Sequence, residues 1–181
     1  PKKWQIEILK VFGINKDKIL NSKIYNHIYA DEVYSVDHPW YENGYIQYNL
    51  HKLPKWIIKK NREIFLKKNS KTIKKKIFLD RSSSSFNHCQ IENIEQIIKL
   101  MLKRNIKIYK PEFLSFKNQI KLFNSSSLII GAHGAAFTNI IFCKPGTKIL
   151  EIIPSDHPNQ KCKRISKILK LKYYRIKTVP K

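Results

Sequence analysis

The chain has 181 residues, of which 42% are hydrophobic, and its 36 lysines and arginines against 13 aspartates and glutamates give a formal net charge of +23. Such a hydrophobic content excludes an intrinsically disordered chain and is typical of a globular protein. No apolar run reaches the about 20 consecutive residues that a membrane-spanning helix needs. The length suffices for one substantial domain and part of a second.

The sequence pattern of residues 3–68 predicts two helices that are separated by a strand region. Apolar residues at helical spacing predict a helix over 3–12, which ends at Gly13. Alternating apolar residues predict one or two strands over 23–36. An aromatic loop with proline and glycine follows, and a lysine-rich helix is predicted from Pro54 to Lys68.

From residue 76 onward, strands and helices alternate. Strands separated by helices of about 10–15 residues indicate crossover connections and a parallel sheet. Continuous apolar runs are typical of parallel strands that are buried on both faces. We therefore predict a Rossmann-like α/β domain over 70–181, preceded at 1–69 by the end of an N-terminal domain and a linker. The predicted strands are 76–80, 106–110, 127–132, 147–154 and 173–179, and the predicted helices are 91–105, 114–126, 135–142 and 158–172.

The positive charge is mostly lysine, because arginine occurs five times in the whole chain. Lysine, isoleucine and asparagine share AT-rich codons, so a biased genome explains their joint abundance better than a selected nucleic-acid surface. Base readout also relies on bidentate arginine, which is scarce here. A basic nucleic-acid-binding module stays the alternative, and a basic surface is also compatible with an anionic membrane.

The three cysteines, Cys89, Cys143 and Cys162, are too widely spaced for a metal or redox motif. We therefore expect reduced thiols and a cytoplasmic protein, with peripheral membrane association as a further option. The chain starts at Pro1 with neither a methionine nor a signal-like apolar stretch. We expect a piece of a longer protein whose upstream domain is absent.

A glycine-containing turn, GAHGAAFTN, follows the predicted strand 127–132. In an open parallel sheet, ligands bind at the carboxyl ends of the strands, where the strand order reverses. Gly131 and Gly134 let a ligand approach the backbone, and the next helix offers free N–H groups and a positive dipole end to an anion. His133 is a further donor candidate, and Asn139 contacts a ligand only if its helix face is turned toward it. A tight packing turn explains the same residues equally well.

Two charged residues at other strands add to this pattern. Arg81 follows the predicted strand 76–80, where it can clamp a phosphate or pair with Asp80. Glu151 is an acid within an apolar strand, and such acids are rare unless they are paired or functional. It can accept from a ribose diol, or it has a structural partner such as Arg81 or a helix N-terminus. The serine- or cysteine-nucleophile arrangements and the Walker lysine are absent.

The order of three blocks resembles glycosyltransferase family 61, which includes bacterial capsular-polysaccharide transferases, plant xylosyltransferases and animal O-GlcNAc transferases. The blocks are KIFLDR, IENIEQI and YKPEFLSFKNQIKLFNSSSLIIGAHGAAFTNIIFCKPGTKILEIIP, and they cover residues 76–154. The resemblance implies an inverting enzyme of GT-B architecture, with this chain as its C-terminal half. It implies a nucleotide-sugar donor, usually a UDP-sugar, a glycan or polysaccharide acceptor and no obligatory metal.

The resemblance also assigns roles to individual residues. Arg81 would contact the donor diphosphate, the backbone around His133 would cradle it, and Phe113 and its neighbours would border the base and ribose. Ala136 departs from the family's usual HGAGLTN turn, in which a second glycine stands. Glu151 would be a ribose-side or structural acid. The full set of donor-binding candidates is Arg81, Phe113, Leu114, Ser115, Gly131, His133, Gly134, Ala135, Asn139 and Glu151.

The resemblance implies that the sugar is transferred by a single displacement, which needs a general base that takes the proton of the acceptor hydroxyl. In enzymes of this kind the base usually comes from the N-terminal domain, so this chain offers only candidates from the aromatic loop: Asp37, His38 and Glu42. A catalytically idle nucleotide-binding domain is the remaining alternative.

Overall fold

The computed structural model describes residues 3–35, 49–66, 74–83 and 89–179. The contacts between residues divide the chain into two units, Pro1–His38 and Pro39–Lys181. The boundary predicted near residue 70 stays a prediction.

The first unit holds a helix, α1 (Lys3–Val11), and a short 3-10 helix, η1 (Lys16–Lys18). The helix predicted over 3–12 is confirmed. The strands predicted over 23–36 are wrong, because the described part of this segment contains no strand. Ile24 and Tyr29 are 69% and 94% exposed. Alternating side chains form a strand only when another strand pairs with the backbone and a core covers one face, and this unit supplies neither in its described residues.

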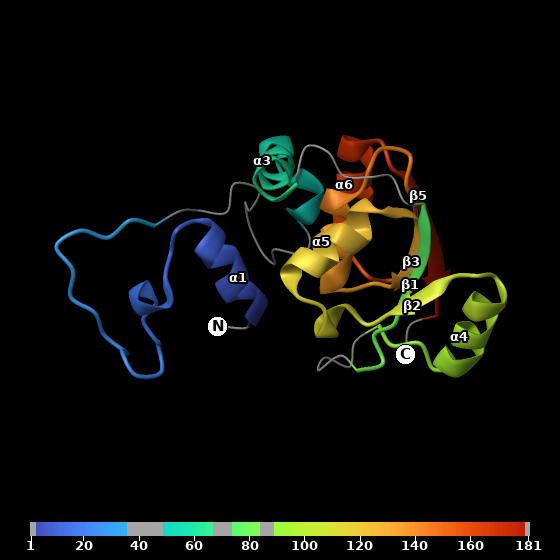
Figure 1. Ribbon diagram of the computed structural model, residues 1–181, viewed down its shortest axis with the longest axis horizontal. Coiled ribbons are helices and arrows are strands. Elements are labelled where there is room, and N and C mark those ends of the chain that lie inside the picture. The colour runs from blue at the N-terminus through green and yellow to red at the C-terminus, as the bar shows by residue number, and fades with distance from the viewer. Residues whose placement is uncertain (1–2, 36–48, 67–73, 84–88, 180–181) are drawn as a thin grey trace. The chain divides into compact units, whose positions relative to one another are not determined.

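Five parallel strands form the sheet of the second unit (Figure 1). Their order is β2-β1-β3-β4-β5, so the chain turns back between β1 and β3. The predicted parallel α/β sheet is confirmed, and the point of reversal is where ligands bind in such sheets. The strands are β1 (Lys75–Leu79), β2 (Lys107–Tyr109), β3 (Ser126–Ala132), β4 (Lys148–Pro154) and β5 (Lys172–Thr178).

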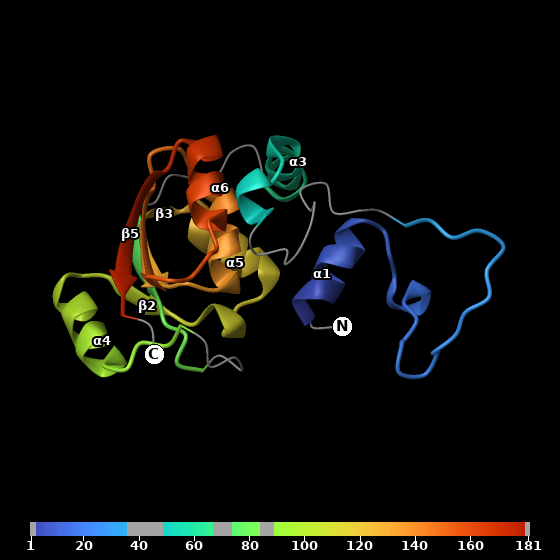
Figure 2. The same cartoon turned by 180° about the vertical axis from the view of Figure 1, so that it is seen from behind.

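Helices cover the two faces of the sheet unequally. Figures 1 and 2 show α4 on one face and α3, α5 and α6 on the other. None of the helices in the described ranges is long and apolar enough to cross a bilayer. The segment predicted as a short helix over 135–142 forms a 3-10 helix. The helical elements are η2 (Leu50–Lys52), α3 (Lys55–Phe65), α4 (Ile94–Lys103), η3 (Pro111–Phe113), α5 (Phe116–Asn124), η4 (Ala135–Phe142) and α6 (Lys161–Leu169).

The sheet separates two hydrophobic clusters, because successive side chains of a strand point to opposite faces. Phe78 of β1 packs with Met101 of α4 on one side. Ile77 and Leu79 belong to the larger cluster on the other side, which α3, α5, η4 and α6 help to build. Phe65 of α3 joins it edge-on to Phe116, with ring centroids 5.1 Å apart. Helix α3 is therefore anchored to the sheet, although it precedes the predicted domain boundary.

Candidate functional site

Arg81 and the glycine turn meet at the point where the strand order reverses. Arg81 directly follows β1, and its Nη1 donates a hydrogen bond to the backbone carbonyl of His133, just after β3. A Cβ atom on Gly134 would lie 2.5 Å from Cζ of Arg81. Glycine is therefore required here by the close approach of the guanidinium, which a larger side chain would displace.

Gly131 serves the packing of the sheet instead. A Cβ at this position would lie 3.0 Å from both Cβ and the backbone carbonyl oxygen of Leu79 on the neighbouring strand β1. The two glycines of the turn thus differ: Gly134 makes room for a charged side chain, and Gly131 lets two strands pair closely.

The side chain of His133 is turned into the protein, where it meets a buried acid. Its Nδ1 lies 2.6 Å from Oε1 of Glu151, and the hydroxyl of Tyr173 donates to Oε2 of the same carboxylate at 2.6 Å. Glu151 is 1% exposed and His133 4%. Burial, the largest influence, would raise the pKa of Glu151, but hydrogen bonds from His133, Tyr173 and Cys162 lower it below its ordinary value. Because the ionised carboxylate only accepts, Nδ1 of His133 carries the proton.

These contacts favour the structural role among the two that the sequence left open for Glu151. Both oxygens of the carboxylate already accept hydrogen bonds from protein side chains, and a contact of Glu151 with the donor stays a prediction. Its partners are a histidine and a tyrosine rather than Arg81 or a helix N-terminus. The backbone N–H of His133 also donates to the carbonyl of Ile152 at 2.7 Å. Two hydrogen bonds, one from the side chain and one from the backbone of His133, therefore hold the start of the turn to β4.

Three residues of this network have no site role predicted from the sequence: His157, Cys162 and Tyr173. The His157 ring lies 4.4 Å from that of His133, centroid to centroid. The pKa of Cys162 is raised well above its ordinary value, chiefly by burial and by the charge of Glu151. No local sequence pattern marks Tyr173, because its place beside Glu151 follows from its register with Ile149, two residues before Glu151 and on the same sheet face.

One cluster of potential metal-binding atoms occurs in the described ranges. Donor atoms of His133, Glu151 and Cys162 all lie within 4.8 Å of one another. Metals bind a thiolate, whereas burial and the neighbouring carboxylate keep this thiol protonated. The carboxylate oxygens are engaged as well. The cluster therefore fits a hydrogen-bond network better than a metal.

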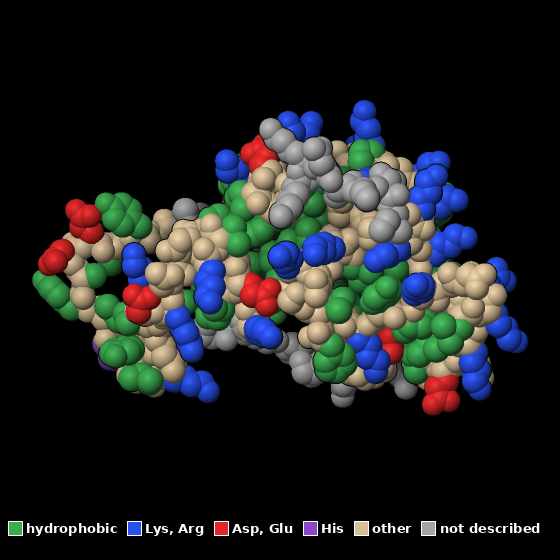
Figure 3. Space-filling model, viewed as in Figure 1, with side chains coloured by type: hydrophobic (Ala, Val, Ile, Leu, Met, Phe, Trp, Pro, Cys, Tyr) green, Lys and Arg blue, Asp and Glu red, His purple; other side chains and the backbone are tan. Residues whose placement is uncertain are grey.

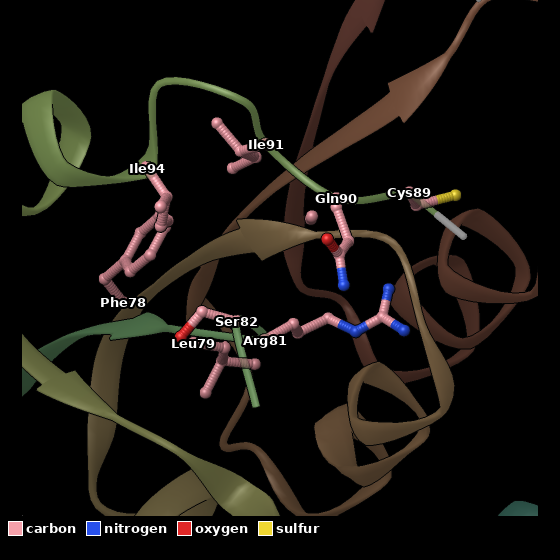
Figure 4. Close-up of a pocket in the computed structure, with 9 residues that line it drawn as sticks. Phe78, Leu79, Arg81, Ser82, Cys89, Gln90, Ile91 and Ile94 are labelled. Atoms are coloured by element: carbon pink, nitrogen blue, oxygen red, sulfur yellow. The ribbon is translucent and has the colours of Figure 1, made fainter. Parts of the chain in front are cut away.

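A small cavity of about 80 Å³ lies beside Arg81 (Figure 4). The Arg81 guanidinium and the Gln90 amide point toward one another at its edge, and apolar side chains line the opposite part. Burial lowers the pKa of Arg81, and Cys89 and Glu112 oppose this effect, but arginine stays charged in proteins. The lining residues are Phe78, Leu79, Arg81, Ser82, Cys89, Gln90, Ile91, Ile94 and Ala132.

Asp80 does not pair with Arg81. It is 2% exposed and accepts from the backbone N–H of Ser82 at 2.8 Å, while Nζ of Lys110 lies 3.6 Å from its Oδ2. Lys110 also donates to Ser83 at 2.7 Å. Arg81 and Lys110 therefore place two positive groups around the loops that follow β1 and β2.

The remaining predicted residues lie at the start of α5 and in η4. Ser115 caps α5 by accepting from the N–H of Asn118, and Leu114 packs on the core. Phe113 is 73% exposed. Asn139 donates to Gln119 of α5 at 2.7 Å, and Ala135, the first residue of η4, is exposed. Asp37, His38 and Glu42 lie outside the described residues.

The fold is that of an α/β protein with a parallel sheet, and the candidate site with Arg81 lies at the reversal of its strand order. A family model described as Glycosyltransferase 61 matches residues 4–150. The chain therefore belongs to the glycosyltransferase 61 family.

The similar proteins include three plant enzymes. Beta-1,2-xylosyltransferase RCN11 of Oryza sativa subsp. japonica is 36% identical over 63 residues, or 35% of this chain. A beta-1,2-xylosyltransferase of Arabidopsis thaliana is 38% identical over 61 residues, or 34%. Xylan glycosyltransferase MUCI21 of the same plant is 37% identical over 51 residues, or 28%. The matched segments span 12%, 11% and 10% of these relatives' own lengths.

Replacing the buried acid tests its charge. The pKa of Glu151 is lower in the folded chain than its ordinary value of 4.5. The carboxylate therefore stabilises the fold at neutral pH, and this stabilisation is lost as the pH falls below 4.5. We expect Glu151→Gln to lower the free energy of unfolding at neutral pH by about 3 kcal/mol and to flatten its acid dependence. Urea titrations across acidic pH measure both effects.

Glu63→Gln, on the surface of α3, is the control for Glu151→Gln. An unchanged acid dependence of the unfolding free energy in Glu151→Gln would contradict the assignment.

Tyr173 offers a separate test of the same network. Tyr173→Phe removes the hydroxyl donor and keeps the ring, so it should cost about 1–3 kcal/mol of unfolding free energy. The neighbouring Tyr174 is 52% exposed on the opposite sheet face, and Tyr174→Phe should change stability by less than about 0.5 kcal/mol. Equal effects of the two substitutions in denaturant unfolding would show that the hydroxyl bond to Glu151 contributes nothing.

Proposed function

We propose that this chain is the donor-binding part of a glycosyltransferase that moves a sugar from a nucleotide-sugar to a glycan or polysaccharide acceptor. The observation that carries the proposal is the position of the Arg81 guanidinium against the turn at His133 and Gly134. Membership of the glycosyltransferase 61 family and the names of the plant relatives support it.

The diphosphate of the donor would lie at the N-terminal end of η4. The first N–H groups of a helix have no partner within it, so those of Ala135 and Ala136 can point at phosphate oxygens. Arg81 has five N–H donors, and its bond to His133 uses one nitrogen. The planar fork of a charged guanidinium matches phosphate geometry. Lys110 adds a second positive group nearby.

The same groups would also assist the departure of the nucleoside diphosphate. Negative charge develops on the diphosphate as the bond to the sugar breaks, and fixed donors aimed at that charge stabilise the transition state. We therefore propose a single inverting displacement on a UDP-sugar in a GT-B enzyme. Arg81 and the helix end would supply charge stabilisation without an obligatory metal. The general base would lie outside the described ranges, where Asp37, His38 and Glu42 stay candidates.

Arg81→Ala tests the charge of the site. We expect the affinity for UDP, measured by isothermal titration calorimetry, to fall about 10- to 100-fold, the equivalent of roughly 1.5–3 kcal/mol for a charged hydrogen bond. Arg104→Ala, at the far end of α4, is the matched control and should bind UDP as the wild type does. Arg81→Lys should restore little, because lysine lacks the planar fork. UDP binding that is equal in all variants would refute the proposal.

Gly134→Ala tests the geometry. The new methyl group would meet the guanidinium at 2.5–2.8 Å, and the flexible end of Arg81 can move aside. We expect UDP affinity to fall while thermal unfolding changes little. Gly131→Ala should do the opposite and lower the unfolding temperature, because its methyl group meets the backbone of Leu79 at 3.0 Å. An unchanged UDP affinity of Gly134→Ala would contradict the placement of Arg81 in the donor site.

A further inference from the structure

The outer face of α3 carries a tryptophan where a soluble helix has polar residues. Trp56 is 62% exposed. Lys55, Lys59 and Lys60 are exposed as well, and residues three and four positions apart lie side by side on a helix. Lys59 and Lys60 therefore lie beside Trp56 on the solvent side of α3, and Lys55 directly precedes it.

The opposite face of α3 fixes this orientation. Ile58 is 1% exposed in the larger core cluster. Arg62 donates to the backbone carbonyl of Ile141 and, at 2.8 Å, to that of Cys143. Helix α3 thus has a complete inner face without Trp56, and the exposure of this ring is set by the fold.

Helix α6 extends the basic surface. Arg164 of α6 donates from Nε to the backbone carbonyl of Leu53, directly before α3, at 3.2 Å, and both ribbon views place α3 beside α6 (Figures 1 and 2). Lys163, Lys167 and Lys170 are exposed at helical spacing on and just after α6. We call Trp56 and the exposed lysines 55, 59, 60, 163, 167 and 170 the α3–α6 basic face.

Among the described residues, acidic groups are scarce on this face. Figure 3 shows basic side chains on the surface around α3, beside one acidic side chain. The acid of α3 is Glu63, which pairs with Lys60 at 3.6 Å, and α6 has none. The other described acids of this unit lie on or beside α4 or close to the carboxyl ends of the strands, as Asp80 and Glu112 do. The distribution leaves a positive surface away from the candidate donor site.

The residue types on this face distinguish between anionic partners. Single-stranded nucleic acids are bound by several stacking aromatic rings in a groove, and base readout uses arginine forks. Here one indole projects from the outside of a helix among lysines. Indole rings prefer the headgroup level of a bilayer, and lysines are attracted to anionic lipids while their stems cover apolar surface. We propose that the α3–α6 basic face docks on a membrane surface that contains anionic lipids.

The basic face and the donor site use different residues. Arg81 and Gly134 lie at the carboxyl ends of β1 and β3, whereas the docking residues lie on the outside of α3 and α6. Membrane docking does not rest on nucleotide-sugar binding, so either inference can fail alone. In this docking the lysines would supply electrostatic attraction and the indole would add buried apolar area, and the strength of interfacial binding depends on both.

Vesicle sedimentation of the 181-residue chain tests whether the lysines of the α3–α6 basic face bind anionic lipids. We expect binding to phosphatidylcholine vesicles that contain phosphatidylserine and none to phosphatidylcholine alone. The triple substitution Lys55→Gln, Lys59→Gln and Lys60→Gln should weaken binding about 100-fold, at roughly fivefold for each lysine near the surface. The control triple substitution Lys99→Gln, Lys103→Gln and Lys107→Gln removes the same charge from the region of α4 and β2. Equal loss in both triple variants would mean diffuse attraction by net charge and would overturn the proposal.

Tryptophan fluorescence tests the contact itself. In a Trp4→Phe, Trp40→Phe background, the emission of Trp56 should shift to shorter wavelength with phosphatidylserine vesicles and stay unchanged with phosphatidylcholine. Trp56→Ala should weaken vesicle binding while circular dichroism stays the same. Emission that does not move on the anionic vesicles would overturn the proposal. Tight binding of an RNA oligonucleotide that is lost in the α3 triple variant, with vesicle binding unaffected, would identify the face as a nucleic-acid surface instead.

Discussion

The candidate site depends on one buried charge, the carboxylate of Glu151. An ionised acid in a core is tolerated only when other groups hydrogen-bond to it, since water no longer does. Its partners come from three different elements: His133 after β3, Cys162 on α6 and Tyr173 on β5. The carboxylate of Glu151 on β4 therefore links the turn after β3, helix α6 and strand β5. If the ring of His133 moved away, the buried carboxylate of Glu151 would lose one of its hydrogen-bond donors.

A second charge is positioned from this first one. Holding His133 fixes the backbone of the turn, whose carbonyl receives the guanidinium of Arg81 from the end of β1. Gly134 has no side chain in the way of that approach. The turn thus contacts both charges: the side chain of His133 meets the buried carboxylate of Glu151, and its backbone carbonyl meets the guanidinium of Arg81.

The regular part of the fold could be predicted because its pattern is local. Strands β1, β3 and β4 carry apolar runs, and α4, α5 and α6 are amphipathic helices between strands, so period and length indicate parallel strands with helices on their faces. The segment 23–35 has a similar alternation but no strand in the structure, since pairing depends on a partner that no local pattern reveals. Conversely, Tyr173 has the residue type expected in any strand. Only its register with Ile149 brings its hydroxyl to Glu151.

By itself, the sequence determined the order of strands and helices, the strand end that carries Arg81 and the turn that carries Gly134, because these follow from spacing along the chain. It left Glu151 with two roles and left Arg81 with two partners. Tertiary structure decided the protein contacts of both, since only the folded chain brings His133 and Tyr173 to the carboxylate and the carbonyl of His133 to the guanidinium. Strands that are consecutive in the sheet but distant in the chain brought Glu151 to His133 and Tyr173, and Arg81 to the turn.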